Sequence, residues 1–174
     1  TIVFDRELDP KIESLSGSLG SDARLLRGPG GEICRVHFIE KILCSLLAKL
    51  VNFIPGAGIW LNTQRPEWND ANNALVGNGL SVVTLCYLRR SLRFWIDLLG
   101  KSEARGFKIS DEVVKLLELV YYLFKEKYSV LATGFTDSDR YDFAMKLGNA
   151  GDEYRQTIYS NSFSGVKSFT GREH

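Results

Sequence analysis

Four segments of the chain carry apolar residues at steps of three and four positions, and this spacing constrains the fold more than any other feature. It places the apolar side chains on one face of a helix, which can then pack against a core. Pro55 and Gly100 follow the first two segments, and Ser110 with two acidic neighbours is typical of a helix start. The predicted helices cover about residues 33–54, 80–99, 110–128 and 137–159. We therefore predict a mainly α fold with four principal helices in hairpin pairs.

Two features inside the predicted helices bear on packing and charge. Gly148 and Gly151 interrupt the last helix, and each weakens it by about 1 kcal/mol. Arg89, Arg90 and Arg93 cluster on the helix 80–99. We expect these three arginines to lie on a solvated face.

The two ends of the chain lack the helical period. Glycine and proline punctuate residues 1–32, which we predict to be an irregular arm. Residues 33–159 form the expected helical domain, and residues 160–174 are small, polar and aromatic, as in a tail. Strand-like alternation is confined to Ile2–Phe4 and Ser129–Ala132.

Charge and composition exclude several classes of protein. The 22 Lys+Arg residues against 21 Asp+Glu residues leave a net charge of +1, which argues against a nucleic-acid binder. Apolar runs all break before the roughly 20 residues that a bilayer requires, so we expect no membrane partner. Cys34, Cys44 and Cys86 form no CxxC pair, and no Cys/His spacing fits a metal cage. We therefore expect reduced thiols, a cytoplasmic protein, and neither a metal nor a cofactor.

The segment between the first two predicted helices is both polar and aromatic. Its densest part reads Arg65-Pro66-Glu67-Trp68-Asn69-Asp70-Ala71-Asn72-Asn73. An aromatic ring covers the apolar face of a sugar, amides bind hydroxyl groups, and a carboxyl group can deliver a proton to the glycosidic oxygen. We interpret the segment as a sugar site with the candidate substrate-binding residues Arg65, Trp68, Asn69, Asn72, Asn73 and Trp60.

Asp70 and Glu67 are the candidate catalytic carboxyl groups. A general acid must keep its proton near neutral pH, which requires desolvation or a nearby negative charge. Trp68 would supply the first and Glu67 the second. An inverting glycosidase also needs a second carboxylate about 6.5–9.5 Å from the acid. Carboxylates elsewhere in the chain that are candidates for this second role are Glu32, Glu40 and Asp22.

The run from Glu67 to Asn73, followed by Val76-Gly77-Asn78-Gly79 and by Ser81 at the head of an apolar helix, resembles the acidic loop of the cellobiose phosphorylase family. In that family a D-W-N-D segment precedes V-G, a further glycine and a helix start that contains serine. More loosely, the run is similar to the inverting α/α-barrel glycosidases, which use a Trp-associated Asp as the general acid. Glu67 stands where the family has its first Asp.

The resemblance implies that Asp70 protonates the leaving oxygen and that Trp68 and Asn69 shape the surrounding subsite. It also implies an (α/α) six-hairpin barrel, which has more helices than the four predicted here. We therefore expect the chain to be part of a larger polypeptide. The remainder of that polypeptide would supply the general base or the phosphate site of a glycoside hydrolase or phosphorylase-like enzyme.

Two other interpretations compete with the enzyme. The chain would be a non-catalytic helical module if Trp60, Trp68 and the amides bind a carbohydrate or a protein partner. It would be a plain helical domain if the segment only caps a helix, with Asp70 or Asn72 accepting backbone N–H groups and Trp68 filling the core.

Overall fold

A computed structural model describes residues 5–28, 30–62, 78–104 and 106–171. The chain divides into two compact units, Thr1–Arg35 and Val36–His174. The first unit contains the helix α1 (Leu8–Leu19) and the 3-10 helix η1 (Gly20–Arg24).

The first unit is more regular than the sequence predicts. Asp5 lies just before α1, and its Oδ1 accepts hydrogen bonds from the backbone N–H groups of Glu7 and Leu8, each at 2.9 Å. Gly17 lies inside α1, and Gly20 follows its last residue. The prediction of an irregular arm is therefore wrong over α1 and η1, because the helix tolerates Gly17 in its interior and ends only at Gly20.

The second unit contains the predicted helices. The predicted segments 33–54, 80–99, 110–128 and 137–159 each contain or overlap one long helix, and the mainly α prediction is confirmed. The predicted strand Ser129–Ala132 is wrong, because those residues belong to a short helix. The helices are α2 (Phe38–Leu50), α4 (Val82–Gly100), α5 (Asp111–Glu126), α6 (Tyr128–Thr133) and α7 (Asp137–Asn161).

Two small antiparallel sheets accompany these helices, and the sequence analysis did not predict their strands. The strands are β1 (Phe53–Ile54), β2 (Gly58–Asn62) and β3 (Asn78–Ser81) in one sheet, and β4 (Gly106–Ser110) and β5 (Lys167–Gly171) in the other. In the second sheet Lys108 is opposite Phe169. The predicted tail 160–174 therefore includes a paired strand, β5. Its pairing with β4 places the chain that follows α7 beside the start of α5.

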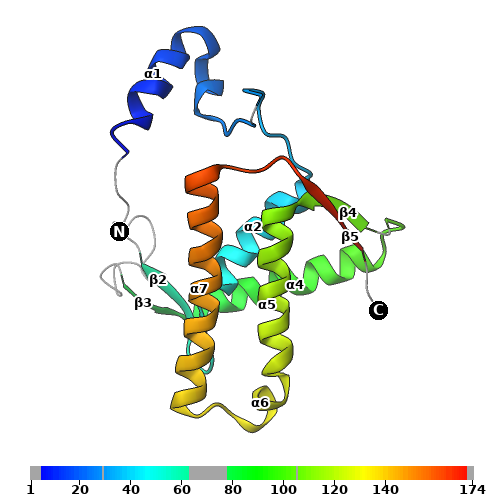
Figure 1. The fold of residues 1–174 in the computed structure, drawn as a ribbon. Coiled ribbons are helices and arrows are strands. Elements are labelled where there is room, and N and C mark those ends of the chain that lie inside the picture. Colours follow the sequence, from blue (N-terminus) through cyan, green and yellow to red (C-terminus); the bar gives the residue numbers. More distant parts are fainter. Residues whose placement is uncertain (1–4, 29, 63–77, 105, 172–174) are drawn as a thin grey trace. The chain divides into compact units, whose positions relative to one another are not determined.

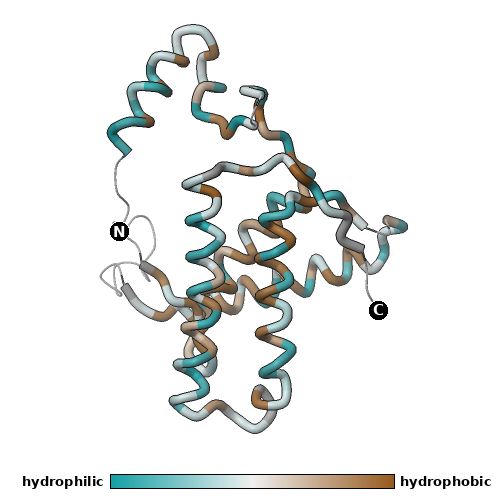
Figure 2. The backbone as a smooth tube through the Cα atoms, in the orientation of Figure 1, coloured by the Kyte–Doolittle hydropathy of each residue, from teal (hydrophilic) through white to brown (hydrophobic). Residues whose placement is uncertain are grey.

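The hydrophobic core lies among α2, α5 and α7. The helices α5 and α7 run antiparallel and are joined by α6 (Figure 1). Figure 2 shows hydrophobic residues interspersed with hydrophilic ones along both helices, as expected for amphipathic helices. Phe143 of α7 is fully buried and packs against the rings of Phe53, Phe124 and Phe135. The buried core residues are Leu47, Val51, Ile109, Val113, Leu116, Val120, Phe143, Leu147 and Ala150.

The helices do not all form the hairpin pairs that the sequence predicts. α5 and α7 form one hairpin, but a β-sheet lies between α2 and α4 in the sequence. The described residues contain six α-helices and show no barrel. Among them, no helix combines the length and the apolar character needed to cross a bilayer.

Candidate functional site

The sheet formed by β1, β2 and β3 contains the residues that come directly before and after positions 63–77, where most of the predicted sugar-binding residues lie. In the antiparallel pair of β2 and β3, Asn62 is opposite Asn78 and Leu61 is opposite Gly79. The pairing therefore brings together Asn62 and Asn78, the residues on either side of 63–77. The predicted site residues Arg65, Glu67, Trp68, Asn69, Asp70, Asn72 and Asn73 all lie outside the described residues.

The same hairpin is fixed to the start of α4. Ser81 ends β3 and caps α4, because its Oγ accepts a hydrogen bond from the backbone N–H of Thr84 at 3.1 Å. Gly58 allows β2 to approach this point closely, since a Cβ at Gly58 would lie 2.9 Å from the carbonyl oxygen of Ser81. The helix predicted from residue 80 begins at Val82, and Ser81 is its N-cap. The residues on either side of 63–77 thus belong to two paired strands that are anchored to the start of α4.

Of the predicted substrate-binding residues, Trp60 is the one that the structure describes. It lies in β2 with 45% of its surface exposed, opposite Leu80, which is 38% exposed. Ile59 and Ser81, which form the next cross-strand pair, are buried. The backbone N–H of Trp60 donates to the carbonyl oxygen of Asn52 at 2.8 Å. The strand therefore presents a large aromatic ring to solvent from a fixed backbone.

A buried carboxylate lies away from this hairpin, at the start of α5. Glu40 of α2 is 1% exposed, and its Oε2 accepts a hydrogen bond from the backbone N–H of Ser110 at 3.2 Å. Its Oε1 is buried and has no hydrogen-bond partner among the described residues. Ser110 precedes the first residue of α5, so the carboxylate lies at the positive end of the helix dipole. This contact gives Glu40 a structural role.

Glu112 lies in the first turn of α5 and also accepts a backbone hydrogen bond. Its Oε1 accepts from the N–H of Ser164 at 2.8 Å. Burial raises the pKa of Glu112, but hydrogen bonds from Ser164 and the other backbone groups outweigh it, so the pKa lies below its ordinary value. The residue is therefore ionised at neutral pH and is not a proton donor there.

Cys44 and Tyr154 complete this polar cluster. Their side chains lie 3.9 Å apart, Sγ to hydroxyl oxygen. Burial raises the pKa of the Cys44 thiol, and burial together with the Cys44 contact raises the pKa of Tyr154. At neutral pH both groups stay protonated, so neither is an activated nucleophile. A pocket of about 370 Å³ beside them is lined by Glu112, Lys115 and Tyr154 among others.

Glu40 was predicted only as a candidate second carboxylate and the cluster itself was not predicted, although the helical register carries a signal for it. Glu40, Cys44, Leu47 and Val51 follow each other at the spacing i, i+4, i+7 and i+11, which is one face of α2. Leu47 and Val51 are buried core residues. The side chain of Glu40 lies on the same face of α2 and is therefore buried too. No group of three or more metal-ligating side chains occurs in the part of the chain that the structure describes.

No protein-family model matches the chain, and no curated protein matches it. The described residues define a mainly helical protein in which the antiparallel strands β2 and β3 come directly before and after residues 63–77 in the sequence.

Proposed function

We propose that this chain is part of a carbohydrate-active enzyme, a glycoside hydrolase or a phosphorylase-like protein, in which Asp70 is the general acid. The observation that carries the proposal is the exposed ring of Trp60 on the strand that leads into residues 65–73. An exposed aromatic ring beside amides and carboxyl groups is the combination that a sugar ring requires, because the sugar has an apolar C–H face and a polar rim.

In this proposal each residue of the segment has a separate role in catalysis or in sugar binding. Asp70 donates a proton to the oxygen of the leaving sugar as the glycosidic bond breaks. Glu67 favours the protonated form of Asp70 through its negative charge. Trp60 and Trp68 cover the sugar rings, and the hydroxyl groups are bound by Arg65, Asn69, Asn72 and Asn73.

The rest of the enzyme lies outside this chain in the proposal. Glu40 accepts a hydrogen bond from the backbone N–H of Ser110 at the start of α5, so we do not assign it as the second carboxylate. The general base or the phosphate site then comes from the remainder of the parent polypeptide. An (α/α) six-hairpin barrel would be completed by further helices of that polypeptide. We also propose a cytoplasmic location, since Cys34, Cys44 and Cys86 are free thiols.

The test is the turnover of α- and β-linked gluco-oligosaccharides by the parent protein, with and without inorganic phosphate. Asp70→Asn is expected to lower turnover by about 10²- to 10⁴-fold. Asp97→Asn is the matched control, because Asp97 is an exposed carboxylate on α4 whose described partner is Arg93. If Asp70→Asn turned over these substrates as fast as the wild type, Asp70 would not be the general acid.

A second candidate function is a non-catalytic module that binds carbohydrate or protein, and the exposure of Trp60 favours it too. This module would bind cellobiose or maltose by itself, and Trp60→Ala would abolish binding. Binding that Asp70→Asn leaves unchanged, together with no turnover by the parent protein, would favour the module over the enzyme.

A further inference from the structure

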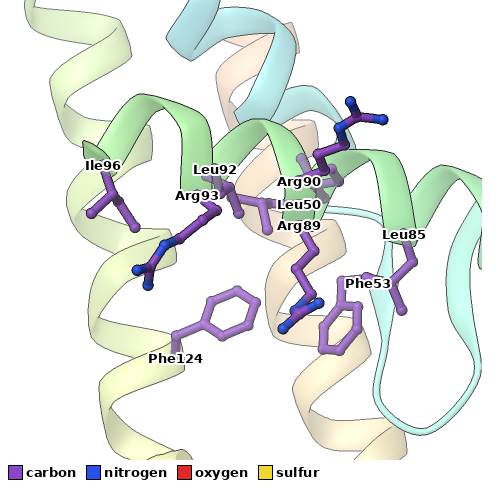
Figure 3. A pocket seen from close by; sticks show the side chains of 10 residues that line it. Leu50, Phe53, Leu85, Arg89, Arg90, Leu92, Arg93, Ile96 and Phe124 are labelled. Carbon is purple, nitrogen blue, oxygen red and sulfur yellow. The ribbon is translucent and has the colours of Figure 1, made fainter. Parts of the chain in front are cut away.

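A groove of about 820 Å³ runs along α4 in the second unit. On the α4 side it is lined by apolar residues that include Leu85, Leu92 and Ile96, and Phe53 and Phe124 lie opposite (Figure 3). The groove is large enough to take several side chains of another molecule.

The floor of the groove belongs to the hydrophobic core. The rings of Phe53 and Phe124 stack with their centroids 5.8 Å apart, and Phe124 packs against the buried ring of Phe143 at 5.2 Å. The groove therefore leaves one side of the core's aromatic cluster open. Apolar side chains that fill it would remove this surface from water, which is favourable.

Arginines on α4 line the same groove. Figure 3 shows Arg89 and Arg93 on the side of α4 that faces the two phenylalanines, and Arg90 also lines the groove. Arg93 pairs with Asp97 at 3.4 Å in an exposed contact. Arg89 has no ion pair with any described residue. Two cations one helical turn apart repel each other, so an acidic group between them would be stabilised on both sides.

The length of this face indicates the kind of occupant. Val82 and Ile96 lie on the same side of α4 as Arg89 by helical spacing, and they are 59% and 63% exposed. The face from Val82 to Ile96 is about 21 Å long, or about four helical turns. Such a length fits a helix with apolar residues at i, i+3, i+4 and i+7.

The opposite side of α4 indicates a protein environment as well. Tyr87 and Phe94 lie there and are 67% and 58% exposed. A helix with large apolar residues on several sides is typical of one that other protein elements surround. A small apolar ligand in the groove would cover only one of these sides.

We propose that the groove along α4 is the docking site for an acidic amphipathic helix supplied by protein outside this chain. Its apolar face fills the groove against Phe53 and Phe124, and its glutamates or aspartates pair with Arg89 and Arg93. A second copy of the chain fits less well, because a two-fold contact through this face would place its arginines against each other. The proposal is independent of the proposed enzymatic function.

The probes for the test are two labelled helical peptides of about 18 residues, five turns long. Both carry leucines at i, i+3, i+4 and i+7, and they differ only in having glutamate or lysine at the flanking positions. Fluorescence anisotropy with the full chain is expected to show about tenfold tighter binding of the glutamate peptide. Arg89→Glu/Arg93→Glu is expected to reverse this order.

The control variant is Lys41→Glu/Lys108→Glu, which changes the net charge equally at two exposed lysines outside the groove. It should keep the order of the wild type, and circular dichroism verifies that both variants fold. The proposal would be overturned if the two peptides bound equally or if neither bound. It would also be overturned if Arg89→Glu/Arg93→Glu left the order of the two peptide affinities unchanged. Two results would assign the groove to another occupant and overturn it as well: self-association that Ile96→Glu abolishes, or displacement of the peptide by phosphatidylglycerol vesicles.

Discussion

Gly151 of α7 lies directly against Val51 at the end of α2, and a Cβ added to this glycine would stand 2.9 Å from Cγ2 of Val51. Val51 is buried, so it has little room to move away. Gly148 lies one turn earlier in α7, and a Cβ added there would meet no neighbouring atom within 4 Å. The two glycines of one helix therefore have opposite packing environments.

This difference predicts opposite effects of alanine at the two positions. Gly151→Ala should lower the free energy of unfolding by about 1–3 kcal/mol, because the methyl group overpacks the contact with Val51. Gly148→Ala should raise it by about 0.5–1 kcal/mol, because alanine favours the helix and meets no atom. Urea denaturation of both variants measures the effects. Effects of the same sign would contradict the packing described for α7.

The buried carboxylate of Glu40 should contribute to stability. Glu40→Ala removes the hydrogen bond to the backbone N–H of Ser110 and leaves that donor buried. We expect a loss of about 1–3 kcal/mol in the free energy of unfolding. Glu118→Ala on the exposed side of α5 should stay within about 0.5 kcal/mol of the wild type. A loss at Glu40 no larger than at Glu118 would show that the contact is not stabilising.

The lowered pKa of Glu112 predicts part of the acid sensitivity of the fold. A carboxyl group whose pKa is lower in the folded state stabilises it fully above the pKa of the unfolded state, roughly 4.3 for glutamate. That contribution is lost as the pH falls through the lower, folded value. The free energy of unfolding of the wild type should therefore exceed that of Glu112→Gln at pH 7, and the gap should shrink between pH 5 and pH 3. A constant gap over this range would mean that the charge of Glu112 is not involved.

The cysteines should differ in their reactivity. Cys44 is half-buried with a raised pKa, whereas Cys86 is exposed on α4. Because the thiolate is the reactive form, iodoacetamide at pH 8 should modify Cys86 well before Cys44. Peptide mapping by mass spectrometry gives the two rates. Modification of Cys44 at the rate of Cys86 would contradict the burial of its thiol.

The helices could be predicted from the sequence because their apolar period extends over many turns. The prediction came within two residues of the start of α4 at Val82 and of α5 at Asp111. The strands were missed because they are only two to five residues long, too short for alternation to stand out. Ser129–Ala132 lies in α6 and not in a strand, because a run as short as Val130-Leu131-Ala132 is compatible with either structure and its period does not distinguish them.

The candidate site was predictable only in its chemistry. The sequence contains the carboxyl groups and aromatic rings of residues 60–73, but the pairing of Asn62 with Asn78 depends on contacts between residues far apart in the chain. The burial of Glu40 follows from its position one turn before Cys44 on the core face of α2. Charged residues are rarely fully buried, so the sequence alone does not indicate that Glu40 lies on this face.

The central claim is that Asp70 protonates the leaving oxygen, and leaving-group dependence tests it most directly. A sugar leaving group needs this proton, whereas 2,4-dinitrophenolate leaves without it. For the parent protein we predict that Asp70→Asn lowers kcat/KM by about 10²- to 10⁴-fold on a gluco-oligosaccharide and by less than about tenfold on a 2,4-dinitrophenyl glucoside. An equal loss on both substrates, or no loss on either, would contradict the claim.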